Sequence, residues 1–513
     1  MSQTPVSIFT PEQFVSDEQL MISTAEQFSR KEVLPHVEQI DRQDEGLMPK
    51  LIRKAGDLGL CGVDAPEEYG GLGLSKNLAA RILEFMSLNG SFSVTYGITS
   101  GISQVGLSLF GTEEQKLQYL PRLTSGEWMG AYALSEPNSG SDALSVSTRA
   151  DLRGDHYVLN GTKMWISNAK WADLFLVMAK VDGDKFTAFL VEKDFAGVSV
   201  AREEHKMGLK GSSTARLVLE NAEVPVENVL HQVGLGHHVA FNALNIGRFK
   251  LASMSIGPAR DAMGLAAGYA LERRQFGQPI SSFGLIEKKF AMMASMFFVA
   301  ESMIYRTGAL IDAAFDQHGG TIDGNRKAAE EYAVECSACK IFATEAESII
   351  VDEALQVYGG YGFTEEFPIA RHYRDARVSR IYEGTNEINR LFIADRMARR
   401  IREGRVNGSD SGDSFLSRLA SDALKLARTD QVGLGATSDL LLLTYAEQSA
   451  RLRATQLGGV ASSLYDAALP WLNLKGAQAI QDLTGDSISI PSCPKPDISG
   501  LAAAVYAKRG PIL

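Results

Sequence analysis

The stretch "RIYEGTNEIN", residues 380–389, marks the start of a helix and places an acid immediately before it. Thr385 has the residue type of an N-cap, so the sequence predicts a helix that begins at Asn386. Gly384 frees the backbone to turn, which leaves Glu383 just outside the helix N-terminus. Taken alone, Glu383 is explained most simply as a complement to the helix dipole. The alternative is a general base held in an apolar cleft.

Long helical patterns surround this stretch. Apolar residues recur every three or four positions in the segments 239–276, 285–315 and 326–357. Their lengths predict an antiparallel helical bundle over residues 236–404. The polar Gly/Ser stretch "RVNGSDSGDS", residues 405–414, is predicted to be a linker, and residues 415–513 an additional, mostly helical tail.

The first half of the chain changes from helical to β patterns. Ser16 and Thr112 each precede a glutamine three residues later, the spacing of a capping box, and residues 1–128 are predicted to be helical. Short β-branched and aromatic runs separated by Gly, Asn and Asp turns predict a middle β domain over residues 129–235. The predicted fold class is therefore α+β and mostly helical.

Composition excludes several classes of protein. The chain has 513 residues, 45% hydrophobic and 22% charged, which is typical of a protein with a large buried core. No run reaches the roughly 18 apolar residues of a membrane-spanning helix, and the first residues resemble no signal or transit peptide. We expect a cytoplasmic protein with at most peripheral membrane contact. The formal charge of −11 disfavours a nucleic-acid partner. Cys336 and Cys339 lie in a helical pattern, which predicts reduced structural thiols and no metal site.

Four more stretches carry residues suited to a flat, phosphorylated ligand. "AYALSEPNSGSD", residues 131–142, is a polar turn rich in donors, or only a loop. "NGTKMWISNA", residues 160–169, places a tryptophan and a serine two positions apart on one strand face, either for a ligand or for core packing. "ERRQFGQPI", residues 272–280, and "QVYGGYGF", residues 356–363, suit a phosphate and a close backbone approach; a solvated helix end and a helix terminator are the plain alternatives. No G-x-G-x-x-G follows a predicted strand, so a Rossmann site is not indicated.

The order and spacing of these five stretches resemble the acyl-CoA dehydrogenase family from near the N-terminus to about residue 403. The segments "IFTPEQF", "ALNIGRF" at 243–249 and "FGLIEKKF" at 283–290, with the tail, are most similar to the very-long-chain branch and its bacterial relatives. The resemblance implies an N-terminal helical domain, a middle β domain, a C-terminal four-helix bundle and bound FAD. It also implies a homodimer, with a homotetramer as the alternative, because that branch covers the tetramer surface with its appended domain.

The resemblance assigns FAD contacts motif by motif. Within one subunit, the flavin would be met by Tyr132, Leu134, Ser135, Ser141, Trp165, Ile166 and Ser167. The adenosine diphosphate part would be met from the neighbouring subunit by Arg273, Phe276, Gln356, Gly359 and Gly360. The phosphate and ribityl groups would face the first turn of the last bundle helix, Thr385, Asn386 and Glu387. The family often has a flavin-contacting glutamine where this chain has Glu287, which leaves that contact open.

The resemblance also implies the reaction and its base. Substrate contacts would come from Ser141, Asn245, Arg248 and Gly384. Glu383 matches the base that takes the α-proton of an acyl-CoA, while flavin N5 accepts the β-hydrogen as hydride. The Glu383 backbone N–H and a ribityl hydroxyl would bind the thioester oxygen. The position where some relatives carry their base is Gly247 here. The product would be a trans-2-enoyl-CoA of fatty acid β-oxidation, with electrons passed to electron-transfer flavoprotein.

A preference for long acyl chains is expected from the segment 95–112. Its glycines Gly97, Gly101 and Gly106 would leave room in the acyl cavity, or else only let helices pack closely.

Three other functions stay open. These are an acyl-CoA oxidase that reoxidises its flavin with oxygen, a DNA-associated flavoprotein that acts as a binding module, and an assembly factor without metabolic turnover.

Overall fold

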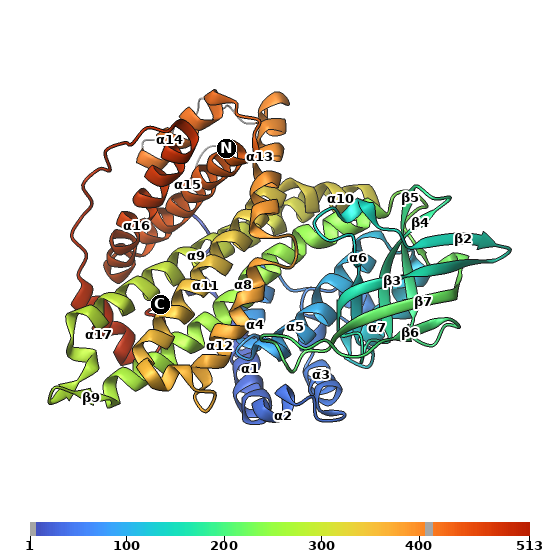
Figure 1. Cartoon of the computed structure of the whole chain (residues 1–513), viewed down its shortest axis with the longest axis horizontal. Coiled ribbons are helices and arrows are strands. Elements are labelled where there is room, and N and C mark those ends of the chain that lie inside the picture. Colours follow the sequence, from blue (N-terminus) through green and yellow to red (C-terminus); the bar gives the residue numbers. More distant parts are fainter. Residues whose placement is uncertain (1–6, 406–413) are drawn as a thin grey trace. The chain divides into compact units, whose positions relative to one another are not determined.

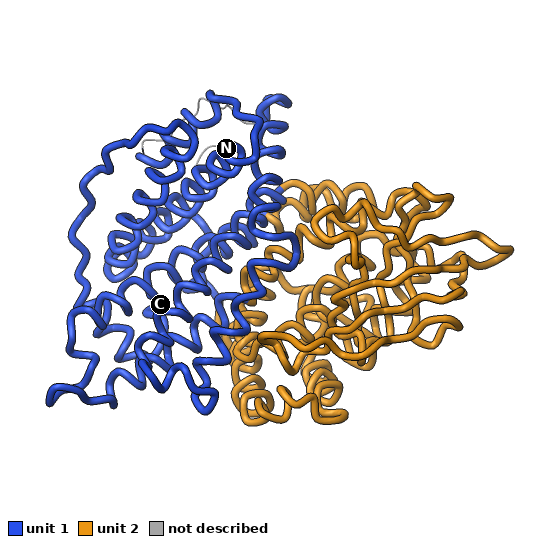
Figure 2. The backbone as a smooth tube through the Cα atoms, in the orientation of Figure 1, with its two compact units in different colours: residues 1–14, 255–310, 332–513 blue, residues 15–254, 311–331 orange. Residues whose placement is uncertain are grey.

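The computed structural model describes residues 7–405 and 414–513 (Figure 1). The chain divides into two compact units, one of residues 15–254 and 311–331, the other of residues 1–14, 255–310 and 332–513 (Figure 2). We call them the β-sheet unit and the bundle unit. Most of the predicted 405–414 linker lies outside the described residues.

The β-sheet unit begins with short helices. They are α1 (Ser16–Phe28), α2 (Val37–Asp41), α3 (Leu47–Asp57), α4 (Lys76–Met86), α5 (Gly90–Gly97), α6 (Ser103–Phe110) and α7 (Glu113–Thr124). The capping box at Thr112 is confirmed: Thr112 Oγ1 accepts from the Gln115 N–H at 3.2 Å, and Gln115 Oε1 accepts from the Thr112 N–H at 3.0 Å. The one predicted at Ser16 is wrong by one residue. Val15 is the N-cap, because the Glu18 carboxylate reaches back to its N–H at 2.9 Å.

An eight-stranded sheet follows. Its strands are β1 (Gly130–Ala133), β2 (Arg149–Arg153), β3 (His156–Ser167), β4 (Leu174–Val181), β5 (Lys185–Glu192), β6 (Val198–Val200), β7 (Thr214–Pro225) and β8 (Val229–Leu230). The order is β6-β7-β3-β2-β4-β5-β8, and β1 pairs with β4. The pairs β1–β4 and β2–β4 are parallel and the others antiparallel. Alternate residues bury a core that includes Phe175, Phe189 and Leu217, as the β-branched and aromatic pattern predicted.

Long helices follow the sheet. They are α8 (Gly236–Glu272), α9 (Gly284–His318), α10 (Ile322–Glu331), α11 (Ala333–Tyr358), α12 (Pro368–Ala376) and α13 (Asn386–Arg402); a hairpin of β9 (Arg274–Gln275) and β10 (Gln278–Pro279) joins α8 to α9. The boundaries between the two units fall within α8 and α9 and just after α10. Helix α13 begins at Asn386, as predicted, and Thr385 Oγ1 accepts from the Ile388 N–H at 3.2 Å. Cys336 and Cys339 are buried on α11, and neither forms a disulfide within the described part of the chain.

The tail is helical, as predicted. It comprises α14 (Phe415–Leu426), α15 (Gln431–Leu457), α16 (Gly459–Thr484) and α17 (Ile498–Lys508). Helices α15 and α16 run side by side (Figure 1). The guanidinium of Arg453 on α15 is fully buried: its Nη1 forms an ion pair with Glu301 of α9 at 2.7 Å, and its Nη2 donates to Glu12. A buried arginine with two carboxylates ties the tail and the N-terminal segment to the bundle. Among the described residues, no helix combines the length and the apolar character that crossing a membrane requires.

Candidate active site

In the β-sheet unit, a buried ion pair holds the polar turn of residues 131–142. The Glu136 carboxylate accepts from Lys163 Nζ at 2.7 Å, and from the backbone and hydroxyl groups of Ser147 and Thr148 at 2.6–3.0 Å. Burial opposes the charge of Glu136, but Lys163 and the hydroxyl donors outweigh it and lower its pKa to about 2. Burial lowers the pKa of Lys163 to about 8, a shift that Glu136 opposes. Lys163 Nζ also donates to the Leu134 carbonyl at 3.2 Å, so the pair fixes a predicted flavin-binding segment.

Trp165 lies where β3 is irregular. The pairing of β3 with β7 shifts register between Lys163 and Ile166, and Trp165 has φ +60°. Its side chain is 57% exposed while Ile166 is buried, so core packing of Trp165 is excluded. The bulge interrupts the regular alternation on which the shared face of Trp165 and Ser167 was predicted. The Met164 N–H donates to the Ser135 carbonyl at 2.8 Å and joins this bulge to the polar turn.

Other predicted residues of the β-sheet unit are positioned less directly. Asn245 and Arg248 lie one turn apart on α8, both buried, and Arg248 Nη1 donates to Asn245 Oδ1 at 3.2 Å. The Tyr132 hydroxyl donates to the carbonyl of Ala240, a residue of the same helix, at 3.3 Å. Ser141 is exposed. The structure therefore pairs the two predicted CoA contacts with each other.

The predicted acyl-cavity glycines lie in or near a π-helical turn over Ile98–Ile102. Within it, Gly101 has the non-helical angles φ −119° and ψ −105°, and such turns occur often at functional sites. A Cβ at Gly97 would meet Met254 Sδ at 2.8 Å, and one at Gly106 would meet Leu176 Cδ2 at 2.9 Å. A Cβ at Gly101 would lie in ordinary contact, 3.5 Å from Lys250 Cδ. Close packing thus explains Gly106 and Gly97, whereas Gly101 retains space.

In the bundle unit, the loop before α13 carries Glu383 with a left-handed backbone. Glu383 has φ +54° and Gly384 φ +82°, and a non-glycine residue in this region is costly unless its surroundings hold it. Two side chains hold this loop by donating hydrogen bonds to its backbone carbonyls. Lys340 Nζ donates to the Gly384 carbonyl at 3.0 Å, and Asn389 Nδ2 donates to the Gly384 and Thr385 carbonyls at 2.7 and 3.1 Å.

A second acid lies behind this loop. Glu347 of α11 is 4% exposed, and within the described residues its Oε2 has no hydrogen-bond partner. Burial raises the pKa of Glu347 to about 8, although the Ser379 and Ser255 hydroxyls oppose the shift. Burial raises the pKa of Tyr382, and the charges of Glu347 and Glu383 add to the shift.

The predicted adenosine diphosphate contacts lie in the bundle unit and are exposed. Phe276, in the turn of the β9–β10 hairpin, is 93% exposed with φ +53°. The Arg273 guanidinium lies 5.6 Å from the centre of the Tyr361 ring. Gln356, Gly359 and Gly360 are exposed at the end of α11, and a Cβ on either glycine would meet nothing within 4 Å. This surface presents an aromatic ring, a cation and open backbone.

Glu287 binds the tail. Its Oε2 accepts from the Ser499 hydroxyl of α17 at 2.8 Å, and its charge adds to burial in raising the pKa of Tyr506 on the same helix. Sequence reasoning missed this partner, which lies 212 residues away. It also missed Glu136, Lys163 and Lys340; of these, Lys340 has a signal in the sequence, because it is a charge within an apolar helical pattern.

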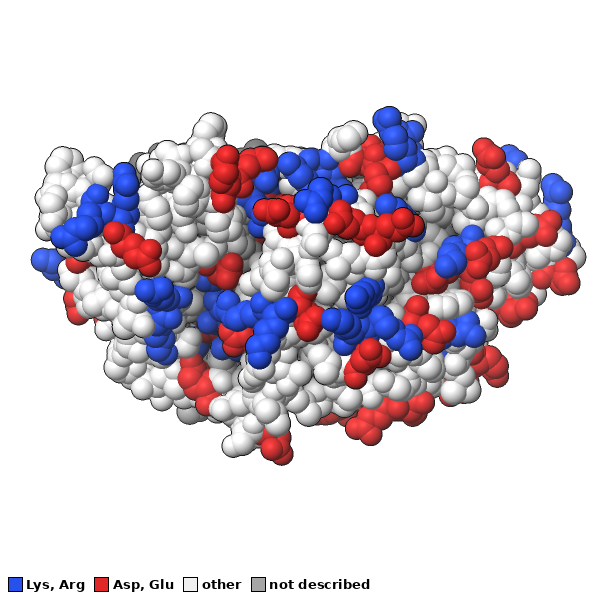
Figure 3. All heavy atoms as spheres, turned by 90° about the horizontal axis from the view of Figure 1, so that it is seen from below, with Lys and Arg blue, Asp and Glu red and all other residues white. Residues whose placement is uncertain are grey.

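Charge on the surface is mixed. On the face seen in Figure 3, Lys and Arg groups are interspersed with Asp and Glu groups. Proteins that bind nucleic-acid backbones present a clustered basic surface, and that face has none. The expectation of no nucleic-acid partner stays a prediction.

Comparison with known proteins explains this combination of residues. The family models of the acyl-CoA dehydrogenase N-terminal, middle and C-terminal domains match residues 16–127, 131–222 and 234–398. A Bacillus subtilis protein named "Probable acyl-CoA dehydrogenase" is 48% identical over 418 residues, which are 80% of this chain and 70% of that protein. The chain belongs to the acyl-CoA dehydrogenase family. It is therefore an oxidoreductase, and the predicted family and fold class are confirmed.

Two further relatives refine the assignment. A crystal structure of an acyl-CoA dehydrogenase from Bacillus anthracis complexed with FAD has a TM-score of 0.88 and 38% identity, covering 98% of this chain and 97% of that one. The mitochondrial very long-chain specific acyl-CoA dehydrogenase of Macaca fascicularis is 42% identical over 350 residues, 66% of this chain. The chain spans about half of that relative's length (51%). The Bacillus anthracis match extends through the tail, so the extra helices have a counterpart there.

Proposed function

We propose that the protein is an FAD-dependent dehydrogenase that converts acyl-CoA thioesters to trans-2-enoyl-CoA in fatty acid β-oxidation. The observation that carries the proposal is Glu383, an acid with a left-handed backbone, held before a capped helix N-terminus in a chain of this family. Left-handed non-glycine residues are costly, persist only where the surrounding structure holds them, and cluster at active sites.

The residues present suit FAD. Trp165 offers an exposed ring to a flat ring system, and the first turn of α13 offers N–H groups and a helix dipole to phosphate. Gly359 and Gly360 leave space that any side chain would fill. When bound, FAD supplies the acceptor for the hydride that leaves the β-carbon of the substrate.

The chain itself handles the proton and the developing charge. The Glu383 carboxylate takes the proton from the carbon next to the thioester carbonyl. Negative charge then develops on the thioester oxygen, and the Glu383 backbone N–H is the donor that stabilises it. Lys340 and Asn389 hold the loop through its carbonyls, so this N–H is fixed before the reaction.

The test is Glu383→Gln, because the amide preserves shape and removes the base. We expect normal FAD content and almost no bleaching of the flavin band during anaerobic titration with acyl-CoA. Glu366→Gln, at an exposed acid of the same unit, is the matched control and should be reduced normally. Near-normal bleaching of Glu383→Gln would exclude Glu383 as the base.

Long acyl chains are the proposed substrates. Two features support this: the likeness to very long-chain enzymes, and the space at Gly101 beside the π-helical turn. Activity should rise from butyryl-CoA to palmitoyl-CoA, and Gly101→Phe should depress the longest chains first. Butyryl-CoA as the best substrate, or equal losses at all lengths, would contradict the proposed chain length and leave the dehydrogenase assignment standing.

Electron-transfer flavoprotein is the proposed acceptor, and the proposed assembly is a homodimer. The acceptor is tested by substrate-dependent reduction of electron-transfer flavoprotein. Rapid oxygen consumption without it would instead identify an acyl-CoA oxidase.

Light scattering of the full chain should give a dimer, and a stable tetramer would contradict the prediction. The cytoplasmic location expected from the sequence stays a prediction.

A further inference from the structure

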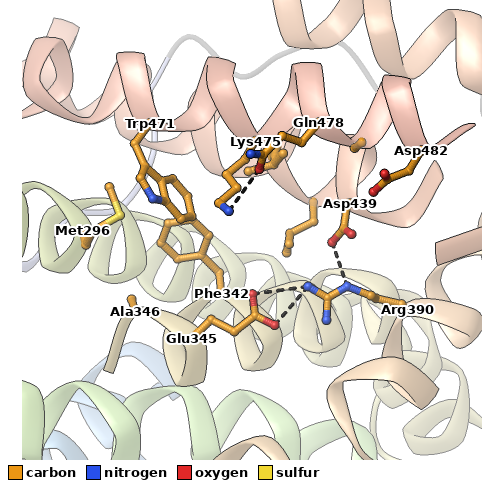
Figure 4. A pocket seen from close by; sticks show the side chains of 13 residues that line it. Met296, Phe342, Glu345, Ala346, Arg390, Asp439, Trp471, Lys475, Gln478 and Asp482 are labelled. Atoms are coloured by element: carbon orange, nitrogen blue, oxygen red, sulfur yellow. Dashed lines mark hydrogen bonds and ion pairs between the residues drawn. The ribbon is translucent and has the colours of Figure 1, made fainter. Parts of the chain in front are cut away.

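A chain of polar side chains runs from the C-terminal tail to the loop that carries Glu383. Its members are Asp439 on α15, Arg390 and Asn386 on α13, and Glu345 and Lys340 on α11. We call it the tail-to-loop network. All five residues lie in the bundle unit, and Figure 4 shows the end nearest the tail.

At the tail end, Arg390 is bound by both its side chain and its backbone. Its Nε donates to Asp439 Oδ1 at 2.7 Å, and its Nη2 donates to the two oxygens of Glu345 at 3.0 and 3.3 Å. In Figure 4 the guanidinium lies between these two carboxylates. The Ser438 hydroxyl donates to the Arg390 carbonyl at 2.5 Å. Helix α15 therefore fixes the position of α13 near its N-terminal end.

At the loop end, the same carboxylate connects to the backbone beside the proposed base. Glu345 Oε1 also accepts from Asn386 Nδ2 at 3.0 Å, and Asn386 Oδ1 accepts from Lys340 Nζ at 2.7 Å. Lys340 Nζ reaches the Gly384 carbonyl at 3.0 Å. Lys340 and Asn386 are at most 1% exposed. Water cannot replace the bonds of these two residues, whereas Arg390, Glu345 and Asp439 at the tail end are 18%, 27% and 33% exposed.

We propose that Asp439 of the tail is a positioning residue for Glu383, acting through Arg390. The inference rests on the proposed role of Glu383 as the base. The loop has a strained backbone that returns to another conformation unless it is held. Charge-assisted hydrogen bonds are short and directional, which suits them to holding it. A mutation far from the reacting groups can still slow the reaction by about 100-fold if it displaces one of these groups by about 1 Å.

The control residue lies in a cavity that Glu345, Arg390 and Asp439 of the network help to line. The cavity has a volume of about 260 Å³ between α9, α11 and α13 on one side and α15 and α16 on the other. The apolar part is lined by Phe342 and Trp471, whose rings meet edge to face at 6.2 Å. Lys475 lines the same cavity and donates to Gln478 of its own helix at 3.1 Å. Lys475→Gln thus changes the charge of the cavity without altering a bond of the network.

The first experiment uses Asp439→Asn in the full-length holoenzyme. We expect kcat with palmitoyl-CoA to fall about 10-fold while KM changes by less than about twofold, because positioning of the base acts on the chemical step. Asn386 heads the helix that suits FAD phosphate, so apoprotein titrated with FAD should also show weaker quenching of flavin fluorescence. Lys475→Gln should match wild type in both measurements. Unchanged kcat and FAD affinity in Asp439→Asn would overturn the proposal.

The second experiment is a double-mutant cycle between Asp439→Asn and Lys340→Met. If the network acts as one unit, the double variant is no slower than the slower single variant. If the two losses multiply, the residues act independently and the proposal is wrong. Should Lys340→Met fail to fold, Glu345→Gln takes its place. A wild-type protein that acyl-CoA cannot reduce would refute the proposed function instead, so the two failures are distinguishable.

Discussion

Two buried glutamates, Glu136 in the β-sheet unit and Glu347 in the bundle unit, have opposite electrostatics. They are 5% and 4% exposed. Glu136 accepts hydrogen bonds from Lys163, Ser147 and Thr148, and its pKa falls to about 2. Burial raises the pKa of Glu347 to about 8, and the Ser379 and Ser255 hydroxyls oppose the shift without reversing it. Equal burial therefore does not decide the charge of a carboxyl; the partners decide it.

The difference suits the surroundings of each glutamate in its own unit. An ionised Glu136 gathers several donors and locks the polar turn of residues 131–142 onto β3. Burial favours the neutral form of Glu347, so this residue adds little negative charge beside Tyr382, the residue before Glu383.

The largest expected effect comes from breaking the ion pair of the β-sheet unit. Glu136→Gln leaves the Lys163 ammonium buried without a counter-ion, and we expect a loss of about 3–5 kcal/mol in the free energy of unfolding. Urea unfolding at pH 7 measures it, and Glu220→Gln, at an exposed acid of β7, is the control.

The pH dependence of this loss has a fixed sign. The folded pKa of Glu136 is about 2, below the ordinary 4.5, so its stabilisation is present above about pH 4.5. It disappears as the pH falls from about 4.5 toward 2, and the two proteins should converge there. A constant difference over that range would show that the loss comes from packing and not from charge.

The variant Glu347→Gln is expected to raise the free energy of unfolding by about 3 kcal/mol at pH 7. The folded pKa of Glu347 is about 8, above the ordinary 4.5, so the folded state keeps a proton that the unfolded state releases. Wild-type stability therefore declines as the pH rises from about 4.5 to about 8. Glu347→Gln cannot release a proton and should be more stable at pH 7, at ~1.4 kcal/mol for each pKa unit of difference. Parallel stability curves for variant and wild type between pH 5 and 8 would contradict the raised pKa.

The smallest effect sharpens the comparison between the units. Thr112 and Thr385 cap helices with the same 3.2 Å bond, one in each unit. Alanine at either position should cost about 1 kcal/mol of stability in thermal unfolding. Only Thr385→Ala should also weaken FAD binding, because only α13 directs its N-terminus at the proposed phosphate site. Equal FAD affinity in the two variants would remove α13 from that site.

Structure that depends on residues a few positions apart was predictable. The caps at Thr112 and Thr385, the start of α13 and the β pattern of the middle segment all arise from spacings of two to four residues. The error at Ser16 had an equally local cause, because Glu18 binds the N–H of Val15. The family assignment followed because its motifs are short and ordered along the chain.

By itself, the sequence determined the helices, the strands and the acid that precedes α13. Only the tertiary structure decided what holds them. Glu136 and Lys163 are 27 residues apart, and Arg390 and Asp439 are 49 apart. The exposure of Trp165 depends on a register shift against β7. A side chain's charge and partner depend on which distant groups folding brings within about 3 Å, and no local pattern of residues encodes that distance.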